Sequence, residues 1–184
     1  KGNIREVLRT LFNSEFFKNS RFMKIKSPVD FVVGTVKIAG SHTVPQPDLI
    51  NLSGSTALMG QTLMDPPTVE SWHTGPEWID SGTLTDRVNF AVEHIGNLNS
   101  DGIKDIINRI KSNGEEISPE ELVDICLDLL GNMEIDDTTR KSLLEFSKSL
   151  GVLIFDNTDS ELESSEKIIN LLQMIVSCRE YQFA

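Results

Sequence analysis

The strongest constraint on the fold is a helix-start signal followed by apolar residues at helical spacing. Ser118, Pro119 and Glu121 form a capping box with proline at the first helical position. The apolar residues behind this box recur every three or four positions and lead to a glycine: Leu122, Ile125, Cys126, Leu129, Leu130 and Gly131. The same periodicity, typical of a helix with one buried face, recurs over residues 103–110, 143–150 and 168–178. The second half of the chain therefore predicts four helices, whose short connections favour an up-down arrangement of antiparallel neighbours.

Helical signals also run through the first half. Apolar residues from Ile4 to Phe12 follow the spacing of one buried helix face. Residues 27–30 (Ser-Pro-Val-Asp) predict a capped helix start, although the β-branched residues within 31–36 favour a strand by propensity. We expect a helix here, because the cap is specific and propensity is a weak prior. Two more helices are expected, over residues 49–59 and from Thr83 to Gly96.

The connections between these segments are irregular. Pro45 and Pro47 indicate a loop, and the acidic, serine-rich residues 156–166 indicate a solvated loop. No pair of segments predicts a convincing strand pairing. We therefore expect an all-α, multi-helix protein with a Pro/Trp-rich irregular loop and an up-down helical second half.

The Pro/Trp-rich loop, residues 66–80 (PPTVESWHTGPEWID), holds both tryptophans and three of the seven prolines. Aromatic rings give a large contact area and prolines pre-organise the loop that carries them, so the segment is either a binding loop or a rigid element between helices. We favour a structural clasp, because large aromatic side chains are highly buried on average. Trp78 should be the more deeply buried ring, because it leads into the helix near Thr83. The candidate binding or clasp residues are Trp72, His73, Glu77, Trp78, Asp80 and Arg87.

The net charge of −11 lies mostly in the second half of the chain. Residues 1–96 carry 9 basic and 10 acidic side chains, whereas residues 97–184 carry 8 and 18. This acidic balance argues against nucleic acid as a partner, because binding phosphates needs a basic face. No apolar run reaches the roughly 18–20 residues that a membrane span needs. The charge distribution predicts two regions: a helical region with the Pro/Trp-rich loop (1–96) and an acidic four-helix region (97–184) packed on it. The alternative is that both form one continuous domain.

The histidines give little support for a metal site. His42, His73 and His94 are widely separated, and none has a second histidine at the spacing of a helical zinc motif. His73 with Glu77 and Asp80 could supply ligands from a folded loop, but this is a weak candidate. We expect no catalytic metal.

Motifs for other chemistry are also absent from the sequence. Cys126 and Cys178 fall on apolar helical stripes, which predicts two buried free thiols. There is no nucleophile elbow, no phosphate-binding glycine loop and no calcium-binding loop. We therefore expect no cofactor, assign no catalytic residue, and favour a fragment that is not an enzyme.

A set of residues at fixed spacing carries a family resemblance: Gly60, Gln61, Leu63, Pro66, Pro67, Val69, Trp72, Gly75, Trp78, Ile79, Leu84 and Arg87. The phrase Lys-Ser-Pro-Val-Asp-Phe-Val-Val at residues 26–33 and the ending from Ser177 to Phe183 belong to the same pattern. On these residues the chain resembles the bacterial family called domain of unknown function 1800. The chain departs from the family at Ser71, where a glycine is usual, and at Cys178-Arg179, where a proline is usual.

The resemblance implies the C-terminal part of a longer, largely helical bacterial protein, from a family whose members are often exported. It supplies no reaction and no catalytic residue. We expect a non-catalytic helical module that packs on the N-terminal part of its own chain or on a partner protein, with a homodimer as a further option. The alternative is the accessory half of an exported enzyme or glycan-binding protein, with Trp72 and Trp78 at the ligand cleft.

The basic residues 1–26, with seven Lys or Arg and two Glu, are the expected partner surface. Phe16, Phe17, Phe22 and Met23 place four large apolar side chains in eight positions without a helical pattern. They cannot all face one core, so we expect an exposed apolar patch here or its burial in a dimer.

Overall fold

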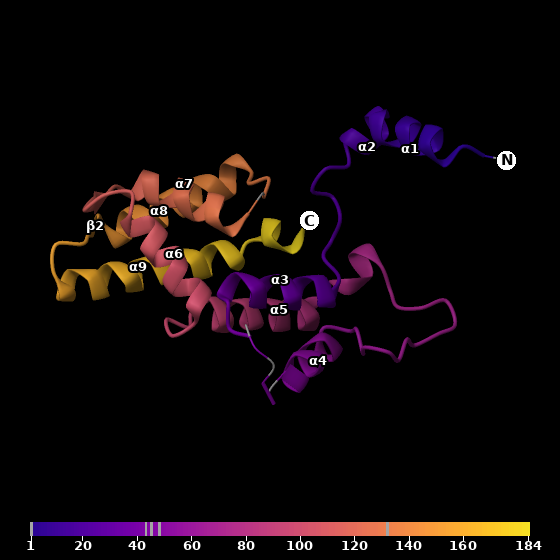
Figure 1. Cartoon of the computed structure of the whole chain (residues 1–184), viewed down its shortest axis with the longest axis horizontal. Helices are drawn as coiled ribbons and strands as arrows, with labels where there is room; N and C mark the ends of the chain where they lie inside the picture. Colours follow the sequence, from indigo (N-terminus) through magenta and orange to yellow (C-terminus); the bar gives the residue numbers. More distant parts are fainter. Residues whose placement is uncertain (1, 43, 45, 48, 132) are drawn as a thin grey trace.

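The computed structural model describes residues 2–42, 44, 46–47, 49–131 and 133–184. In this part of the chain almost all of the regular secondary structure is helical, which confirms the all-α class (Figure 1). The α-helices are α1 (Ile4–Asn13), α2 (Glu15–Lys18), α3 (Pro28–Ala39), α4 (Leu49–Leu58), α5 (Ser81–Ile95), α6 (Asp101–Lys111), α7 (Pro119–Leu130), α8 (Asp137–Leu150) and α9 (Thr158–Val176). Two 3-10 helices and two short strands complete the elements: η1 (Gly75–Trp78), η2 (Arg179–Gln182), β1 (Glu116–Ile117) and β2 (Leu153–Ile154). The expected loop residue Pro45 lies outside the described residues, and Pro47 lies in a turn.

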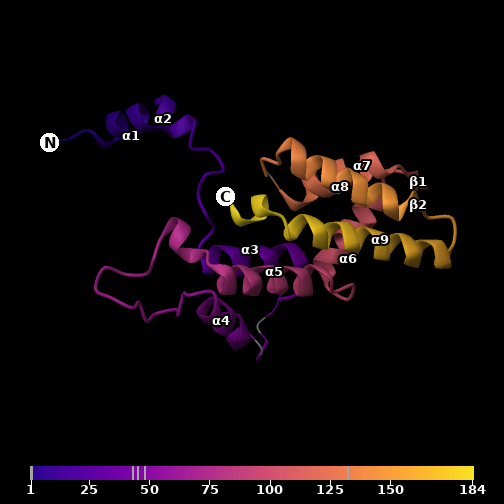
Figure 2. The same cartoon turned by 180° about the vertical axis from the view of Figure 1, so that it is seen from behind.

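The helices form a layered body. Helix α3 packs on α5, α5 packs on α9, and α9 packs on both α7 and α8. Figure 1 shows α7, α8 and α9 running in alternating directions, while α6 crosses from the α3–α5 layer towards α7. Figure 2 shows the same packing from behind. The expected up-down arrangement is therefore confirmed for α7, α8 and α9.

Helix α3 forms although its residues favour a strand. The Ser27 side chain accepts a hydrogen bond from the Asp30 backbone, and the Asp30 side chain accepts one from the Ser27 backbone. Pro28 occupies the first helical position between them. The β-branched residues then suit a buried helix face, because Val32, Thr35 and Val36 pack into the interior. The local cap and the burial together override propensity.

Two expectations about irregular segments are wrong in detail. The short strands β1 and β2 pair antiparallel through Glu116–Ile154 and Ile117–Leu153, where we expected no strand pair. Most of the acidic segment at 156–166 is helical, because the Asn157 side chain accepts hydrogen bonds from the backbone of residues 159 and 160 and starts α9 there. An acidic first turn is favourable next to the positive end of a helix, so the charge run does not require a loop.

Glycines set two close contacts between helices. Gly96 ends α5, yet its φ of −73° is available to any residue. Its role is steric, since a Cβ there would overlap the amide of Gln173, which donates to the Val92 carbonyl at 3.0 Å. At the other contact, a Cβ on Gly102 would overlap the Ile38 carbonyl, so the start of α6 touches the end of α3 backbone to backbone.

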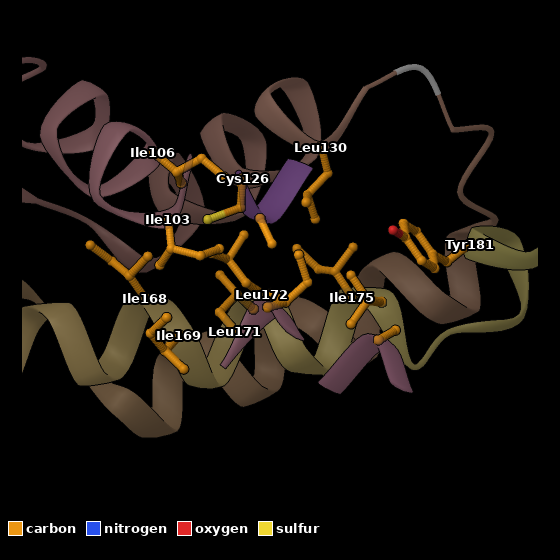
Figure 3. Packing of buried hydrophobic residues seen from close by; sticks show 14 of the residues in the cluster. Ile103, Ile106, Cys126, Leu130, Ile168, Ile169, Leu171, Leu172, Ile175 and Tyr181 are labelled. Atoms are coloured by element: carbon orange, nitrogen blue, oxygen red, sulfur yellow. The ribbon is translucent and has the colours of Figure 1, made fainter. Parts of the chain in front are cut away.

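The apolar core runs through both halves of the chain. Figure 3 shows side chains from α6, α7 and α9 meeting in one interior, with Tyr181 at its edge. The buried cluster also includes Phe31 and Val36 of α3 and Phe90 and Ile95 of α5. Helices on both sides of residue 96 therefore share one core, and the division of the chain at that residue stays a prediction.

Helices α1 and α2 lie apart from this body (Figures 1 and 2). We expected α1 to have a buried face, and this is wrong, because neither α1 nor α2 buries any residue. The apolar face is present but uncovered, with the Ile4 side chain 75% exposed and the Phe16 side chain 77% exposed. Of the four side chains that we expected in an exposed patch, Phe16, Phe17 and Met23 are exposed, whereas Phe22 is half-buried.

Candidate functional site

Three segments that are distant in sequence meet near the C-terminal end of the chain. Residues 24–26 pair with residues 182–184, through a hydrogen bond from the Lys26 backbone to the Gln182 carbonyl at 2.8 Å and one from the Ala184 backbone to the Lys24 carbonyl at 2.8 Å. Ile25 and Phe183 form an isolated antiparallel bridge at this pairing. Helix α5 lies next to the pairing and contributes Arg87 to it. These contacts hold the start of α3, α5 and η2 together.

Arg87 is fully buried below the pairing. Its Nη2 donates to the Lys26 carbonyl at 2.9 Å, its Nη1 donates to Gln182 Oε1 at 3.4 Å, and its Cζ lies 5.2 Å from the centre of the Phe31 ring. Its Nε has no hydrogen-bond partner in the described structure. No carboxylate of the described residues pairs with it, and burial alone lowers the Arg87 pKa to about 10.

Lys26 is the second cation of this cluster. Its Nζ donates to the Tyr181 carbonyl at 2.8 Å and lies 4.3 Å from the centre of the Tyr181 ring. Burial, with a smaller contribution from the charge of Arg87, lowers the pKa of Lys26 to about 8. The Tyr181 hydroxyl is 3.0 Å from the Thr35 hydroxyl, and burial raises the Tyr181 pKa. Both cations are therefore held by carbonyl groups and aromatic rings.

Trp78 is the buried ring of the Pro/Trp-rich loop, at 5% exposed, whereas Trp72 is half-buried, so the expected order of burial is confirmed. The Trp78 ring packs beside Gly60, and its carbonyl accepts a hydrogen bond from the Thr83 hydroxyl at 3.0 Å. Asp80 caps α5 by accepting from the Gly82 and Thr83 backbones, and these hydrogen bonds lower the Asp80 pKa. The loop is thereby fixed to the start of α5.

The other residues of the loop are more exposed. The Trp72 indole donates to the Thr62 carbonyl at 2.9 Å, which pins the ring across the loop. Glu77 accepts from the Thr74 backbone at 3.1 Å and lies 3.6 Å from His73, so its carboxylate serves the start of η1. No group of three or more His, Cys, Asp or Glu in the described part of the chain is placed to hold a metal ion.

Two grooves flank the Ile25–Phe183 bridge, each with a volume of about 620 Å³. The first lies against the Pro/Trp-rich loop, and its lining includes Trp72, His73 and Trp78 together with Lys24, Asp30 and Gln61. The second lies against α5 and η2 and is lined mainly by apolar side chains. Its lining includes Ile25, Ile79, Leu84, Val88, Gln182 and Phe183, together with the cationic side chain of Arg179.

Comparison with known protein families identifies the chain. The model of the family described as "Protein of unknown function (DUF1800)" matches residues 1–183. The chain belongs to the DUF1800 family. No curated protein and no solved structure matches it.

The DUF1800 pattern in the sequence marks the residues that meet in space. Lys26 belongs to the segment 26–33 of this pattern, Arg87 ends the segment 60–87 that holds both tryptophans, and Tyr181 and Gln182 belong to the C-terminal segment 177–183. Of the six candidates from the sequence, Trp72, His73 and Trp78 share a groove, Glu77 and Asp80 serve as caps, and Arg87 lies in the separate buried cluster. Sequence reasoning missed Lys26, Tyr181 and Gln182 as partners of Arg87, and their place in the family phrases was the signal that pointed to them.

The thiols of this DUF1800 chain are free, and they differ in exposure. Cys126 is buried as expected, and burial raises its pKa to about 12. Cys178 is only half-buried, although burial still raises its pKa to about 11. Neither is a thiolate at neutral pH, so neither provides an activated nucleophile. Among the helices described, none is both long and apolar enough to cross a membrane.

Proposed function

We propose that this DUF1800 chain is a non-catalytic protein-interaction module whose docking element is the pair α1–α2. The observation that supports it is the uncovered apolar face of this pair. Its exposed members are Ile4, Val7, Leu8, Leu11, Phe12, Phe16 and Phe17. Contiguous apolar patches on a protein surface mark sites of interaction with other proteins. An amphipathic helix of this kind binds through anchors spaced three or four residues apart.

The charge around this face indicates the chemistry of the partner. Residues 1–26 carry seven Lys or Arg and two Glu, while the remaining residues carry 10 basic and 26 acidic side chains. On and next to α1–α2 the cations Arg5, Arg9, Lys18 and Arg21 outnumber the two glutamates Glu6 and Glu15. An apolar face with such a basic excess favours a partner polypeptide with an apolar surface bordered by acidic groups. Such a surface can belong to another segment of a longer polypeptide or to a separate protein.

The test replaces two apolar side chains on α1. In a Leu8→Glu, Phe12→Glu double variant, the binding of a hydrophobic dye and any self-association of the parent chain should be lost, because two charges break the apolar face. A Val69→Glu variant serves as the matched control, because Val69 is exposed but lies in the Pro/Trp-rich loop. A parent chain that is monomeric and binds no dye, or a double variant that behaves like the control, would rule out this role for α1.

A second candidate function is ligand binding at the first groove. It is favoured by the half-buried Trp72 ring, which lines the groove together with the polar side chains of Lys24, Asp30 and Gln61. Aromatic rings beside polar groups suit the stacking of a sugar ring. The burial of Trp78 leaves only one ring for this purpose. Titration with soluble oligosaccharides should then change the tryptophan fluorescence saturably, and Trp72→Ala should abolish the change; a titration without saturation excludes this candidate.

A further inference from the structure

We propose that the second groove binds a small carboxylate with an apolar body, and that Arg87 and Gln182 recognise its carboxylate. This site is separate from α1–α2 and does not depend on the interaction role of that pair. It rests on three observations on the described residues: a buried guanidinium without a counter-ion, two buried donors without a hydrogen-bond partner, and an apolar groove that Gln182, one of the two donor residues, lines.

The first observation is the charge of the cluster. Arg87 and Lys26 are both held by neutral carbonyl groups and aromatic rings; the charge of Asp30 acts on Lys26, but no carboxylate of the described residues pairs with Arg87. A buried cation without a counter-ion is strongly unfavourable, and the unfavourable energy is relieved when an anion binds it directly. Guanidinium matches the planar geometry of a carboxylate, with two parallel hydrogen bonds.

The second observation is that two donors of the cluster are unused. Arg87 Nε and Gln182 Nε2 are both buried, and neither has a hydrogen-bond partner in the described structure. Buried donors are nearly always paired, so two donors without a partner in one cluster call for an acceptor group, which a water molecule or a ligand can provide. Both atoms are donors, and the group must therefore be an acceptor.

The apolar lining of the groove indicates that the ligand with this acceptor group also has an apolar part. Leu84 and Val88 are close neighbours of Arg87 on α5 and line the groove, whereas Arg87 itself does not line it and adjoins it through its hydrogen bond to Gln182. The Gln182 side chain lines the same groove and accepts from Arg87 Nη1 at 3.4 Å, which is a long hydrogen bond. A carboxylate that displaces Gln182 Oε1 would receive a stronger, charge-assisted bond from the same atom. The volume of about 620 Å³ is in the range of small-molecule sites.

Calorimetric titration with sodium octanoate tests the chemical class. We expect saturable binding at one site, and binding of octan-1-ol, which has the same apolar body without the charge, that is at least about tenfold weaker. Equal binding of the alcohol would show a purely apolar groove and would overturn the proposal. Failure of octanoate to bind would also overturn it.

A variant that leaves Arg87 in place tests the residues. Leu84 is 38% exposed and precedes Arg87 by one helical turn, so Leu84→Glu can be tolerated and brings a carboxylate to the guanidinium. This variant should lose octanoate binding and gain thermal stability, whereas the neutral Leu84→Gln should keep binding within about threefold and should not be stabilised. Leu98→Glu, at another exposed leucine, controls for added negative charge. If Leu84→Glu binds octanoate as well as Leu84→Gln does, the carboxylate does not reach Arg87 and the proposal is wrong.

Discussion

At the scale of single residues, Ser71 stands in a backbone conformation that suits glycine. Its φ is +90°, in a region where a Cβ is unfavourable by roughly 1–2 kcal/mol. The family resemblance places a glycine at this position, so the conformation explains the family preference. The hydrogen bonds of this turn use the Thr68 hydroxyl and the backbone, including one from the Ser71 N–H to the Thr68 carbonyl at 3.1 Å, and none of them uses the Ser71 side chain, so a glycine would keep them.

Ser71→Gly should therefore stabilise the protein by about 0.5–1 kcal/mol, which is the strain relieved less the greater flexibility of glycine in the unfolded chain. Chemical denaturation measures the change. Ser71→Ala is the control and should stay within about 0.5 kcal/mol of the parent, because alanine keeps the Cβ. A glycine variant that is less stable than the alanine variant would contradict a positive φ at this position.

The lowered pKa of Lys26 predicts how the free energy of unfolding changes with pH. Its pKa in the folded protein is about 8, below the ordinary 10.5, so between pH 8 and 10 the unfolded chain binds more protons than the folded protein. Stability attributable to Lys26 therefore rises with pH in this window, and below pH 8 the full cost of the buried charge is present. Asp30 stays charged in this window, whereas Arg87, whose pKa is about 10, begins to lose its proton at the upper end, so the contribution of Lys26 is best separated between pH 8 and 9. The raised pKa of Tyr181 acts above pH 10. In Lys26→Met the rise in unfolding free energy between pH 8 and 9 should disappear, and a parallel profile for parent and variant would contradict the shift.

The two tryptophans should differ in their contribution to stability. Trp78→Ala should cost about 3–5 kcal/mol, because a fully packed ring leaves a cavity. Trp72→Ala should cost less, since its ring is half-buried and loses mainly the hydrogen bond to the Thr62 carbonyl. Urea denaturation of both variants measures the difference. A loss below about 1 kcal/mol for Trp78 would place that ring at the surface.

At the scale of elements, the helices could be predicted because their signals are local. Ser27, Asp80, Ser118 and Asn157 each cap a helix from a position within three residues of its start.

The start of α9 was missed because an acidic run is common to loops and to first turns. The exposure of α1 was missed because apolar spacing reports a face and not whether anything covers it. The cluster of Arg87, Lys26 and Gln182 joins positions up to 156 residues apart, and spacing carries no information about such contacts.

The contact between α3 and α6 gives a prediction at this scale. Gly102→Ala should destabilise the protein by about 1–3 kcal/mol, because the Cβ meets the backbone carbonyl of Ile38, which cannot rotate away. The matched control is Gly54→Ala in the interior of α4, where nothing lies near the added Cβ. That change should stabilise by about 0.5–1 kcal/mol, because alanine is the better helix former. Thermal unfolding of both variants shows whether each change stabilises or destabilises the protein. A Gly102→Ala variant as stable as the parent would contradict the close backbone contact between α6 and α3.

At the scale of the whole molecule, the chain divides into a packed body and a projecting pair of helices. The body holds the shared apolar core and carries most of the negative charge. Helices α1 and α2 contact each other, and the connection from Asn19 to Met23 leads from them to the pairing at Ile25. The stability of the body should therefore be independent of α1 and α2, because the pair adds no buried side chain.

Limited trypsin digestion tests this division. The exposed peptide bonds after Lys18 and Arg21 lie in or next to the connection at residues 19–23. They should be cut first, because an irregular, exposed backbone can enter the active site of a protease. Lys24 is also exposed, yet its carbonyl accepts from the Ala184 backbone, so cleavage there should be slower. The product that begins at Phe22 should keep its helical circular dichroism and a melting temperature within about 4 °C of the parent, a shift that corresponds to less than about 1 kcal/mol. An Arg21→Gln variant should move the first cut to Lys18 and leave the same stable body. If the product unfolds on cleavage, or if the first cuts fall within α5 or α9, then α1 and α2 are integral to the fold and their apolar face is not a free docking surface.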